Sequence, residues 1–308
     1  MTFQHFIITR FNLPIYHATK SGAVSPTDET YLRKRMSIFT ELCLPSVKQQ
    51  TCQDFRWLVL FDAHTPNDIR RQIWALHTYY DRFIPCFFDL ADYPQVDPAY
   101  ERMYRDYVAQ LQPGEYEPVE SNPDEYVRML VVPMFVRDCI FRFLDGKPDF
   151  ILTTRLDNDD ALHRDFIRII QEDALRGPSF FLMDYPNGYR YDLVKREVIR
   201  FHYPSGHFTS LKEPFVKTLY TAQYWVHNVV DKVAPVVHLE REPLYIELVH
   251  DSNVINNTGK SIPKDYLYAL RHFCHRDFGY RGRHLSIKAI LSTLAGYGRA
   301  YVKYKLSR

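Results

Sequence analysis

"DFILTTRLDNDDALHRDFI", residues 149–167, is the stretch that decides the fold. A short apolar run at 150–152 precedes three carboxylates within four positions, and a segment with apolar residues at helical spacing follows. An apolar run of this length between polar residues is typical of a buried strand. A strand, a polar turn and an amphipathic helix in this order form one unit of an α/β fold.

The three carboxylates of this stretch, Asp157, Asp159 and Asp160, have two interpretations. Side chains two positions apart at the end of a strand point the same way, and the following turn would bring a third within reach of one hard cation. Mg²⁺ or Mn²⁺ held there would keep open positions for phosphate oxygens. Alternatively, Asp159 or Asp160 caps the helix that starts near His163. Open α/β sheets bind ligands at the carboxyl ends of their strands, which favours the metal site.

Strand and helix patterns alternate through the first 185 residues. Further buried strands are predicted at HFIIT (5–9), FRWLVLFD (55–62), RFIPCFF (82–88) and SFFLMDY (179–185). The sequence therefore predicts an α/β fold with a mostly parallel central sheet flanked by helices.

The helices between these strands have recognisable start and stop signals. Asp28 can cap the first helix and Thr65 the second, with Pro66 in the first helical position of the second. A third helix, over 124–144, contains Pro133, which should kink it, and a fourth ends at Gly177. Residues 91–123 hold five prolines and no clear period, so an inserted loop or lid is predicted there.

Beyond Tyr185 the pattern changes to short strand-like runs with turn signals, which predict antiparallel structure added to one edge of the sheet. We accordingly divide the chain into a domain over 1–275 and a basic segment over 276–308. Within the domain, a nucleotide-binding half covers about 1–185 and an acceptor half about 186–275.

Composition limits the possible partners. The chain has 308 residues and a formal charge of +2, which gives no reason to expect a nucleic-acid partner. Its five cysteines are scattered, which argues against a disulfide framework and against a thiolate zinc site. No secretory signal or apolar stretch of about 20 residues is present, and we expect a cytoplasmic protein.

Other polar side chains are expected near the same edge of the sheet. Asp62 ends one predicted strand, and Arg10 and Asn12 follow another. Each also has an ordinary structural role open to it, in a turn or an ion pair. His250 could complete a metal shell and His207, in a glycine-containing turn, could meet a substrate hydroxyl, although most lone histidines are structural.

Two blocks together resemble a known family. CLPSVKQQTCQDFRWLVLFD (43–62) and TTRLDNDDALHRDFI (153–167) are similar to the nucleotide-sugar half of a GT-A glycosyltransferase of family 2, the second block matching the Asp-x-Asp element. With HFIITRFN (5–12), the likeness extends to the "putative rhamnosyltransferase" family, over roughly residues 3–255.

The resemblance implies a nucleotide-diphosphate-sugar donor and Mn²⁺ or Mg²⁺ as cofactor. The residues it assigns to the donor are Thr9, Arg10 and Asn12 in the loop beside the nucleotide, Asp62 at the base or ribose, and Arg155 and Asp157. The residues it assigns to the metal are Asp157, Asp159, Asp160 and His250.

The expected activity is metal-dependent transfer of a sugar, rhamnose by the resemblance, to the hydroxyl of a glycan or lipid-linked acceptor in surface polysaccharide synthesis. An inverting reaction needs a base for that hydroxyl. Glu213, at an expected helix start, and Asp184, after the fifth strand, are the candidates, because the usual Glu-Asp signature of family 2 is not plainly present. A metal-dependent phosphohydrolase or nucleotidyltransferase, and a non-catalytic sugar-binding module on a GT-A scaffold, are the alternatives.

The C-terminal segment raises a separate question. From about Ser286, one face of a predicted helix carries a run of apolar residues, with lysine and arginine elsewhere on the helix. Such a helix could lie on anionic lipid at the inner face of a membrane. Packing of the apolar face on the domain is the alternative, favoured by Gly296 and Gly298, which weaken a free-standing helix. The apolar face comprises Ile287, Ile290, Leu291, Leu294, Tyr301 and Val302.

Overall fold

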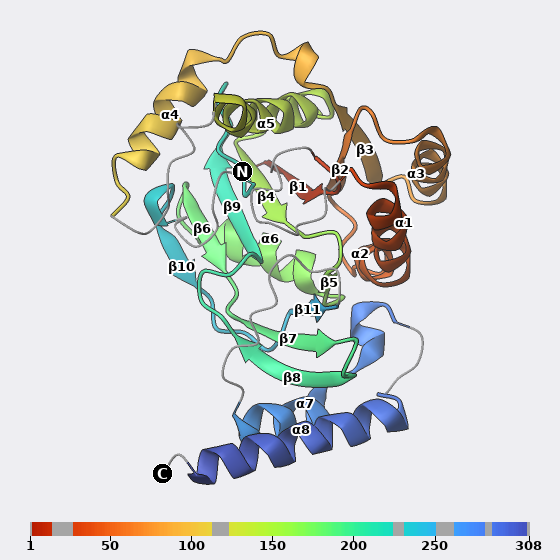
Figure 1. Ribbon diagram of the computed structural model, residues 1–308. Coiled ribbons are helices and arrows are strands. Elements are labelled where there is room, and N and C mark those ends of the chain that lie inside the picture. Colours follow the sequence, from red (N-terminus) through yellow and green to blue (C-terminus); the bar gives the residue numbers. More distant parts are fainter. Residues whose placement is uncertain are drawn as a thin grey trace.

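A seven-stranded sheet forms the centre of the molecule (Figure 1). The computed structural model describes residues 2–13, 27–112, 123–223, 231–250, 262–280 and 285–306. In the order β10-β6-β9-β4-β1-β2-β3, neighbouring strands are parallel except for β9, which is antiparallel to β4 and β6. The strands are β1 (Phe3–Arg10), β2 (Arg56–Asp62), β3 (Phe83–Phe88), β4 (Phe150–Arg155), β6 (Phe181–Asp184), β9 (Thr209–Pro214) and β10 (Val236–His238).

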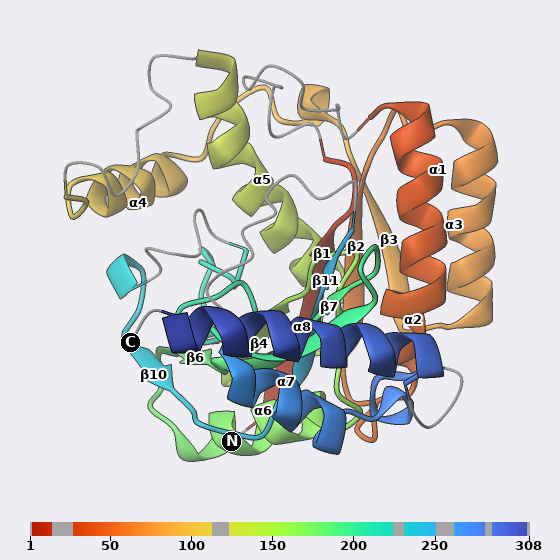
Figure 2. The same cartoon turned by 60° about the horizontal axis from the view of Figure 1, so that its bottom comes forward.

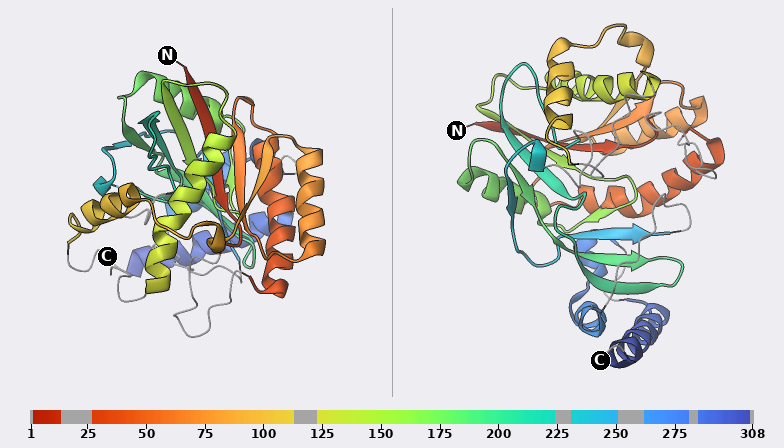
Figure 3. Two further views of the ribbon diagram at one scale, coloured as in Figure 1. Left: turned by 90° about the horizontal axis from the view of Figure 1, so that it is seen from above. Right: turned by 60° about the vertical axis from the view of Figure 1, so that its left-hand side comes forward.

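Helices cover both faces of this sheet (Figure 3). Phe6 and Ile8 of β1 pack in one hydrophobic cluster with α5, while Ile7 between them packs in another with α1, α3 and α6. This alternation follows from the two-residue period of a strand and explains why the strands are apolar throughout. The helices are α1 (Glu29–Ile38), α2 (Leu44–Lys48), α3 (Asn67–Tyr79), α4 (Pro98–Val108), α5 (Pro123–Arg142) and α6 (Phe166–Arg176); a π-helical turn (Phe39–Cys43) joins α1 to α2.

A second sheet lies beside the first, with strand order β5-β11-β7-β8. Its strands are β5 (Ala161–Leu162), β7 (Asn187–Asp192), β8 (Glu197–His202) and β11 (Tyr245–Val249). Figure 2 shows α7 (Pro263–His272) and α8 (Ile287–Leu306) in front of this sheet. Residues of both helices share a hydrophobic cluster with Tyr189, Val198 and Ile246 of the sheet.

Most of the elements predicted from the sequence are confirmed. The α/β class, the mostly parallel sheet and all five predicted strands of the first 185 residues are present. Asp28 caps α1 by accepting a 2.9 Å hydrogen bond from the Tyr31 backbone N–H. Gly177 follows the last residue of α6, and α5 runs without interruption through Pro133. All five cysteines are free, as expected.

Two local predictions are wrong. Thr65 does not cap α3, because its hydroxyl donates to the Asp62 carbonyl oxygen and Pro66 is the N-cap residue. Residues 98–108 are the helix α4 rather than a loop. Its buried face is made of tyrosines at helical spacing, Tyr100, Tyr104 and Tyr107, a period that is hidden when tyrosine is counted as a polar residue.

The placement of the antiparallel structure also needs correction. The antiparallel strand β9 does not extend one edge of the central sheet but lies inside it, between β4 and β6. β7 and β8 belong to the second sheet. The strand Val236–His238 then returns to the first sheet beside β6. The chain after residue 185 therefore supplies two strands of the central sheet, β9 and β10, as well as most of the second sheet.

Two glycines of α8 differ in what surrounds them. A Cβ atom added at Gly296 would lie 2.5 Å from the Tyr266 ring and 2.9 Å from the Glu197 carboxylate, whereas one at Gly298 would meet nothing within 4 Å. Glycine in a helix interior costs about 1 kcal/mol relative to alanine. Gly298→Ala should therefore raise the free energy of unfolding by up to about 1 kcal/mol. Gly296→Ala should lower it, because Tyr266 and Glu197 must move.

Urea unfolding of the two single variants beside the unchanged protein measures this difference. Equal stabilisation by both alanines would contradict the close packing of α8 at Gly296.

Candidate functional site

A tight turn follows β4 and brings the predicted carboxylates to their positions. β4 ends at Arg155, so Asp157 and Asp159 are not residues of a strand. The Asp160 backbone N–H donates to the Asp157 carbonyl oxygen at 3.3 Å, the first-to-fourth residue contact of a β-turn. The two-residue period of a strand therefore does not apply here, and the turn brings Asp157 and Asp160 together.

Asp157 and Asp160 form a group with His207. One potential ligand atom from each of the three side chains lies within 4.8 Å of the others. The His207 Nε2 atom is 2.9 Å from Asp160 Oδ2, and Asp160 Oδ1 accepts a 3.0 Å hydrogen bond from the Leu248 backbone N–H of β11. The group thus joins the turn after β4, the residues before β9 and the second sheet.

The protonation of this group is shifted by its surroundings. Burial raises the pKa of Asp160 to about 7, although the hydrogen bond with His207 opposes the shift. Burial would lower the pKa of His207, but Asp160 and Asp157 outweigh it and raise that pKa. The two side chains therefore hold a proton between them near neutral pH. Two carboxylates and an imidazole are suitable ligands for a divalent cation, which would displace that proton.

Two arginines supply positive charge beside the group. The Arg155 Nε and Nη2 atoms donate to the two Asp157 carboxylate oxygens at 3.2 and 3.3 Å. Burial would raise the pKa of Asp157, but the charges of Arg155, His207 and Arg10 outweigh it and lower that pKa. Arg155 is buried, while Asp157 remains partly exposed. Asp157 is therefore ionised, with guanidinium groups close to where an anionic ligand would lie.

Asp159 and His250, both predicted metal ligands, contact Arg35 of α1. Asp159 Oδ2 forms a salt bridge with Arg35 Nη1 and lies 3.0 Å from His250 Nε2. Arg35 Nη1 and His250 Nε2 are 3.2 Å apart. All three residues are buried, so the charges of Arg35 and Asp159 depend on each other for compensation. We name Arg35, Asp159 and His250 the Arg35 cluster.

The ends of β1, β2 and β4 are tied together by two asparagines. The Asn158 amide donates to the carbonyl oxygens of Arg10 and Phe11 at 3.1 and 3.0 Å. Asn12 accepts from the Asp62 backbone N–H at 3.2 Å and donates to the Thr65 hydroxyl at 3.1 Å. The predicted edge of the sheet therefore exists, but the Asn12 side chain already makes hydrogen bonds to the end of β2 and to Thr65.

Asp62 and Thr9 have different surroundings at this edge. Asp62 Oδ1 accepts from the His64 backbone N–H at 2.7 Å and lies 3.1 Å from His64 Nδ1. Thr9 is completely buried and accepts a 2.9 Å hydrogen bond from the Trp57 indole N–H. The Thr9 side chain is thus part of the core, and only its backbone is left to border a ligand.

The two candidate bases lie in different parts of the central sheet. Asp184 ends β6 opposite Thr209, two residues from His207. Its Oδ2 atom accepts from the Ser205 backbone N–H at 2.9 Å and lies 2.7 Å from His238 Nδ1.

The predicted surroundings of Glu213 are wrong. Glu213 is a residue of β9, not of a helix start, and it pairs with Ile151 near the beginning of β4. Its buried carboxylate accepts hydrogen bonds from the backbone N–H groups of Tyr220 and Thr221 at 2.8 and 2.9 Å. Because β4 runs toward Asp157 from this point, Glu213 is separated from the carboxylate turn by the length of that strand.

The sequence did not connect three residues of the site with their partners. Arg35 lies 124 positions before Asp159, and no local pattern connects the two. Asn158 stands between the predicted ligands, and its role depends on the β1 loop, which the sequence does not position. His207 was considered only as a substrate contact, since its partner Asp160 comes from another strand end.

Breaking the Arg35 cluster should destabilise the protein strongly. Arg35→Met leaves a buried carboxylate without its main compensating charge, so the free energy of unfolding should fall by about 3–5 kcal/mol. Asp159→Asn should have a cost of similar size, because Arg35 is then unpaired, and the double variant should lose clearly less than the sum. Urea unfolding of the three variants provides the double-mutant cycle.

Arg33→Met is the matched control on the same helix. Arg33 contacts Glu29 and Asp68, its side chain is 47% exposed, and exposed pairs contribute only about 0–1 kcal/mol. Strictly additive losses for Arg35 and Asp159 would contradict the coupling between them.

The buried Glu213 should make stability depend on pH. Burial raises its pKa from 4.5 to about 7, so the native state binds this proton more tightly than the unfolded chain. The contribution is fully present below about pH 4.5 and is lost as the pH rises through about 7. Glu213→Gln removes the titration and keeps one of the two oxygen acceptors, while its NH2 group replaces the oxygen that accepts from the other backbone N–H. The lost hydrogen bond lowers stability equally at every pH and leaves the pH dependence as the readout. The stability of Glu213→Gln relative to the unchanged protein should therefore increase between pH 4.5 and 7.

Chemical unfolding over that pH range tests this expectation, with Glu172→Gln, an exposed glutamate, as control. A stability difference that is independent of pH would show that Glu213 does not titrate in this range.

We compared the chain with known proteins and solved structures. Within the described residues, none of the helices combines the length and apolar character that a membrane span requires. No curated protein matches the sequence. The crystal structure of S. aureus TarS residues 1–349 in complex with UDP-GlcNAc is similar at 11% identity and a TM-score of 0.37. The match covers 88% of this chain and 65% of the TarS chain, so this chain spans less than two thirds of the length of the TarS structure.

The sequence profile of one family matches the larger part of the chain. The profile is described as "Putative rhamnosyl transferase", and the matched residues are 4–109 and 133–262. The matched ranges contain β1, β2 and β4, the turn 157–160, His207 and His250. The chain belongs to this family of rhamnosyl transferases.

Proposed function

We propose that the protein is a glycosyltransferase that moves a sugar from a nucleotide-diphosphate sugar to a hydroxyl group of its acceptor, with Mn²⁺ or Mg²⁺ as cofactor. The observation that carries the proposal is the group Asp157, Asp160 and His207 at the carboxyl end of β4, in a chain that belongs to a family of rhamnosyl transferases. This is the edge of an α/β sheet at which ligands bind.

Asp157, Asp160 and His207 are the residues that would hold the metal. Their carboxylate and imidazole atoms lie close enough together to be ligands of one ion. A bound cation would stabilise the negative charge that develops on the departing diphosphate. Because Mg²⁺ prefers oxygen ligands and this group includes a nitrogen atom, we expect Mn²⁺ to support the reaction better.

The protein's own charges act on the same leaving group. Arg155 already holds the Asp157 carboxylate with two donors, and the Arg10 charge reaches the same carboxylate. In the reaction, both guanidinium groups would face the diphosphate oxygens, where they stabilise charge that grows in the transition state. Asp62, whose carboxylate lies at the end of β2, would accept hydrogen bonds from the base or ribose.

The Arg35 cluster would hold the metal turn in place rather than bind the ion. Arg35 and His250 occupy the Asp159 carboxylate, so this carboxylate is compensated without a cation. Asp157 and Asp160 each keep a potential ligand atom within 4.8 Å of one on His207. Asp159 and His250 are then positioning residues, and Asp159 fixes the turn to α1.

Asp184 is the better candidate for the base that takes the acceptor proton. It ends a strand that runs parallel to β4 through the intervening β9, and its partner His238 is half exposed. Glu213 lies toward the other end of β4, where two backbone N–H groups hold it. We therefore propose that Asp184 takes the proton and that Glu213 is structural.

The sugar, the acceptor and the cellular location rest on the family likeness. We propose rhamnose as the transferred sugar and a glycan or lipid-linked molecule of surface polysaccharide synthesis as the acceptor. The proposed location is the cytoplasm, with contact to the inner face of the membrane through residues 276–308.

A donor panel tests the proposed reaction. The purified chain is incubated with UDP-, dTDP- and GDP-sugars, Mn²⁺ and glycan acceptors, while free nucleotide and glycan product are both followed. We expect one donor class to give nucleoside diphosphate and glycan in equal amounts, and chelation of the metal to stop both. Release of inorganic phosphate would indicate a phosphohydrolase instead, and no turnover with any donor and acceptor would indicate a binding module.

Single variants separate the roles within the site. Asp160→Asn and His207→Ala should weaken Mn²⁺ binding, measured by calorimetry, by at least about 10-fold. Asp159→Asn should retain metal binding in the folded fraction while it loses stability. Asp184→Asn should lower kcat without changing Mn²⁺ affinity, and Glu213→Gln should transfer sugar normally. Loss of Mn²⁺ binding only in Asp159→Asn would assign the metal to the Arg35 cluster.

A further inference from the structure

One long side of α8 is apolar and exposed to solvent. Ile287, Leu291, Leu294, Tyr301, Val302 and Leu306, at intervals that repeat on one side of a helix, form what we name the α8 strip. Exposed fractions of their side chains reach 79% at Ile287 and 83% at Leu306, and none is below 44%. The sequence favours packing of this face on the domain. Of the residues predicted for it, Ile290 does pack against the second sheet, whereas the others are exposed.

The opposite side of α8 makes the packing contact. Ala289, Thr293 and Gly296 are its buried residues, and the Thr293 hydroxyl accepts a 3.1 Å hydrogen bond from the Val198 backbone N–H of β8. Gly296 lies so close to Tyr266 that a Cβ atom would clash. Small residues thus dock the helix, which explains why the large apolar side chains face outward.

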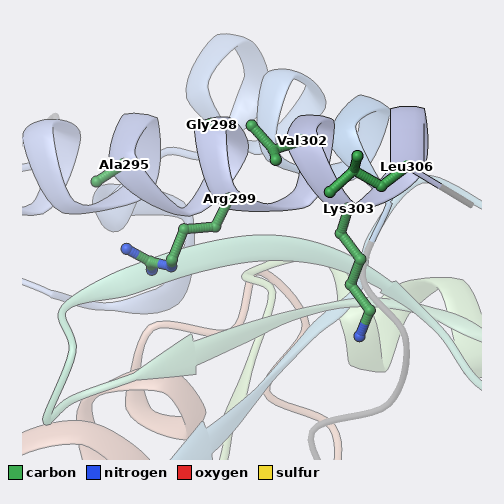
Figure 4. Close-up of a pocket in the computed structure, with 6 residues that line it drawn as sticks. All are labelled: Ala295, Gly298, Arg299, Val302, Lys303 and Leu306. Carbon is green, nitrogen blue, oxygen red and sulfur yellow. The ribbon is translucent and has the colours of Figure 1, made fainter.

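The charge of α8 is entirely positive. Its 20 residues include Lys288, Arg299, Lys303 and Lys305 and no acidic residue. Arg299 forms a salt bridge with Glu197. Figure 4 shows Arg299 and Lys303 extending from the same side of the helix, beside a shallow depression to which Val302 and Leu306 also belong. An apolar strip flanked by basic residues is complementary to an anionic surface with an apolar interior.

We infer that the α8 strip binds the surface of an anionic lipid bilayer. A helix of 20 residues that lies flat presents about 30 Å of this strip to one plane. Tyr301 of the strip and the neighbouring Tyr297 and Tyr304 have aromatic rings with polar ends, which suit the boundary between headgroups and acyl chains. A second copy of the chain is a poorer occupant, because two α8 helices would bring like charges together.

The position of α8 connects this surface to the candidate site. α8 packs on β8, and β8 belongs to the sheet in which the Leu248 N–H of β11 donates to Asp160. The helix α8 and the strands β8, β7 and β11 therefore connect the α8 strip to Asp160. This inference deepens the membrane contact of the proposed function by naming the α8 strip and its anionic lipid. The benefit for a lipid-linked acceptor rests on the proposed sugar transfer, which the vesicle experiment does not measure.

Sedimentation of the full chain with vesicles tests the inference. Phosphatidylcholine vesicles are compared with vesicles that also contain phosphatidylglycerol, at low and high salt. We expect binding to the anionic vesicles that weakens with salt. The double variant Leu291→Asp and Val302→Asp should reduce the partition coefficient at least about 10-fold. Lys303→Gln with Lys305→Gln should reduce it about 10-fold, with little effect on nucleotide release from a donor sugar.

The matched control introduces two aspartates at exposed apolar residues outside α8. Leu175 and Val194 are 50% and 70% exposed and lie outside α8, so Leu175→Asp with Val194→Asp should bind vesicles like the unchanged protein. Equal binding by the α8 variants and the control would overturn the inference, as would binding that ignores lipid charge. So would a dimer, seen by analytical ultracentrifugation, that the α8 variants dissolve.

Discussion

The four side chains of the turn 157–160 each hold a different part of the molecule. Asp157 is clasped by Arg155 of β4, and Asn158 donates to the backbone after β1. Asp159 is compensated by Arg35 of α1, and Asp160 contacts His207 and the backbone of β11. One tight turn therefore joins the central sheet, the helix layer and the second sheet. Loss of any of these contacts would move the carboxylates that we propose to hold the metal.

Three negative charges within four positions are tolerable only because each has its own partner. Coulomb repulsion between neighbouring carboxylates is large where water is excluded, and here it is relieved in three ways. Arg155 keeps Asp157 ionised, Arg35 and His250 compensate Asp159, and a proton is shared between Asp160 and His207. A divalent cation held by Asp157, Asp160 and His207 would replace the proton that Asp160 and His207 share and would leave the buried salt bridge between Arg35 and Asp159 intact, which is why we propose the metal on that side of the turn.

Local pattern was enough to predict the framework but not the partners. Buried strands of the central sheet are apolar on both faces, so β1, β2 and β4 are visible in the sequence. The pairing of Arg35 with Asp159, and of His207 with Asp160, is a long-range consequence of how the elements pack. The candidate metal ligands could be predicted only as a set, because which of these carboxylates lie together depends on where β4 ends. A strand four residues longer would have included both Asp157 and Asp159 and pointed their side chains the same way.

The same limit explains why the sequence did not predict which side of α8 packs on the domain. Its period and composition were clear, but which side packs is decided by how closely the helix approaches β8 and α7. Small residues allow that approach, and the apolar side stays outside.

The most direct measurement for the central claim is the position of bound Mn²⁺, located by anomalous diffraction in crystals soaked with Mn²⁺ and a nucleoside diphosphate. The account predicts an ion within bonding distance of Asp157, Asp160 and His207, with the Arg35 cluster intact. An ion held between Asp159 and His250, with Arg35 displaced, would contradict it.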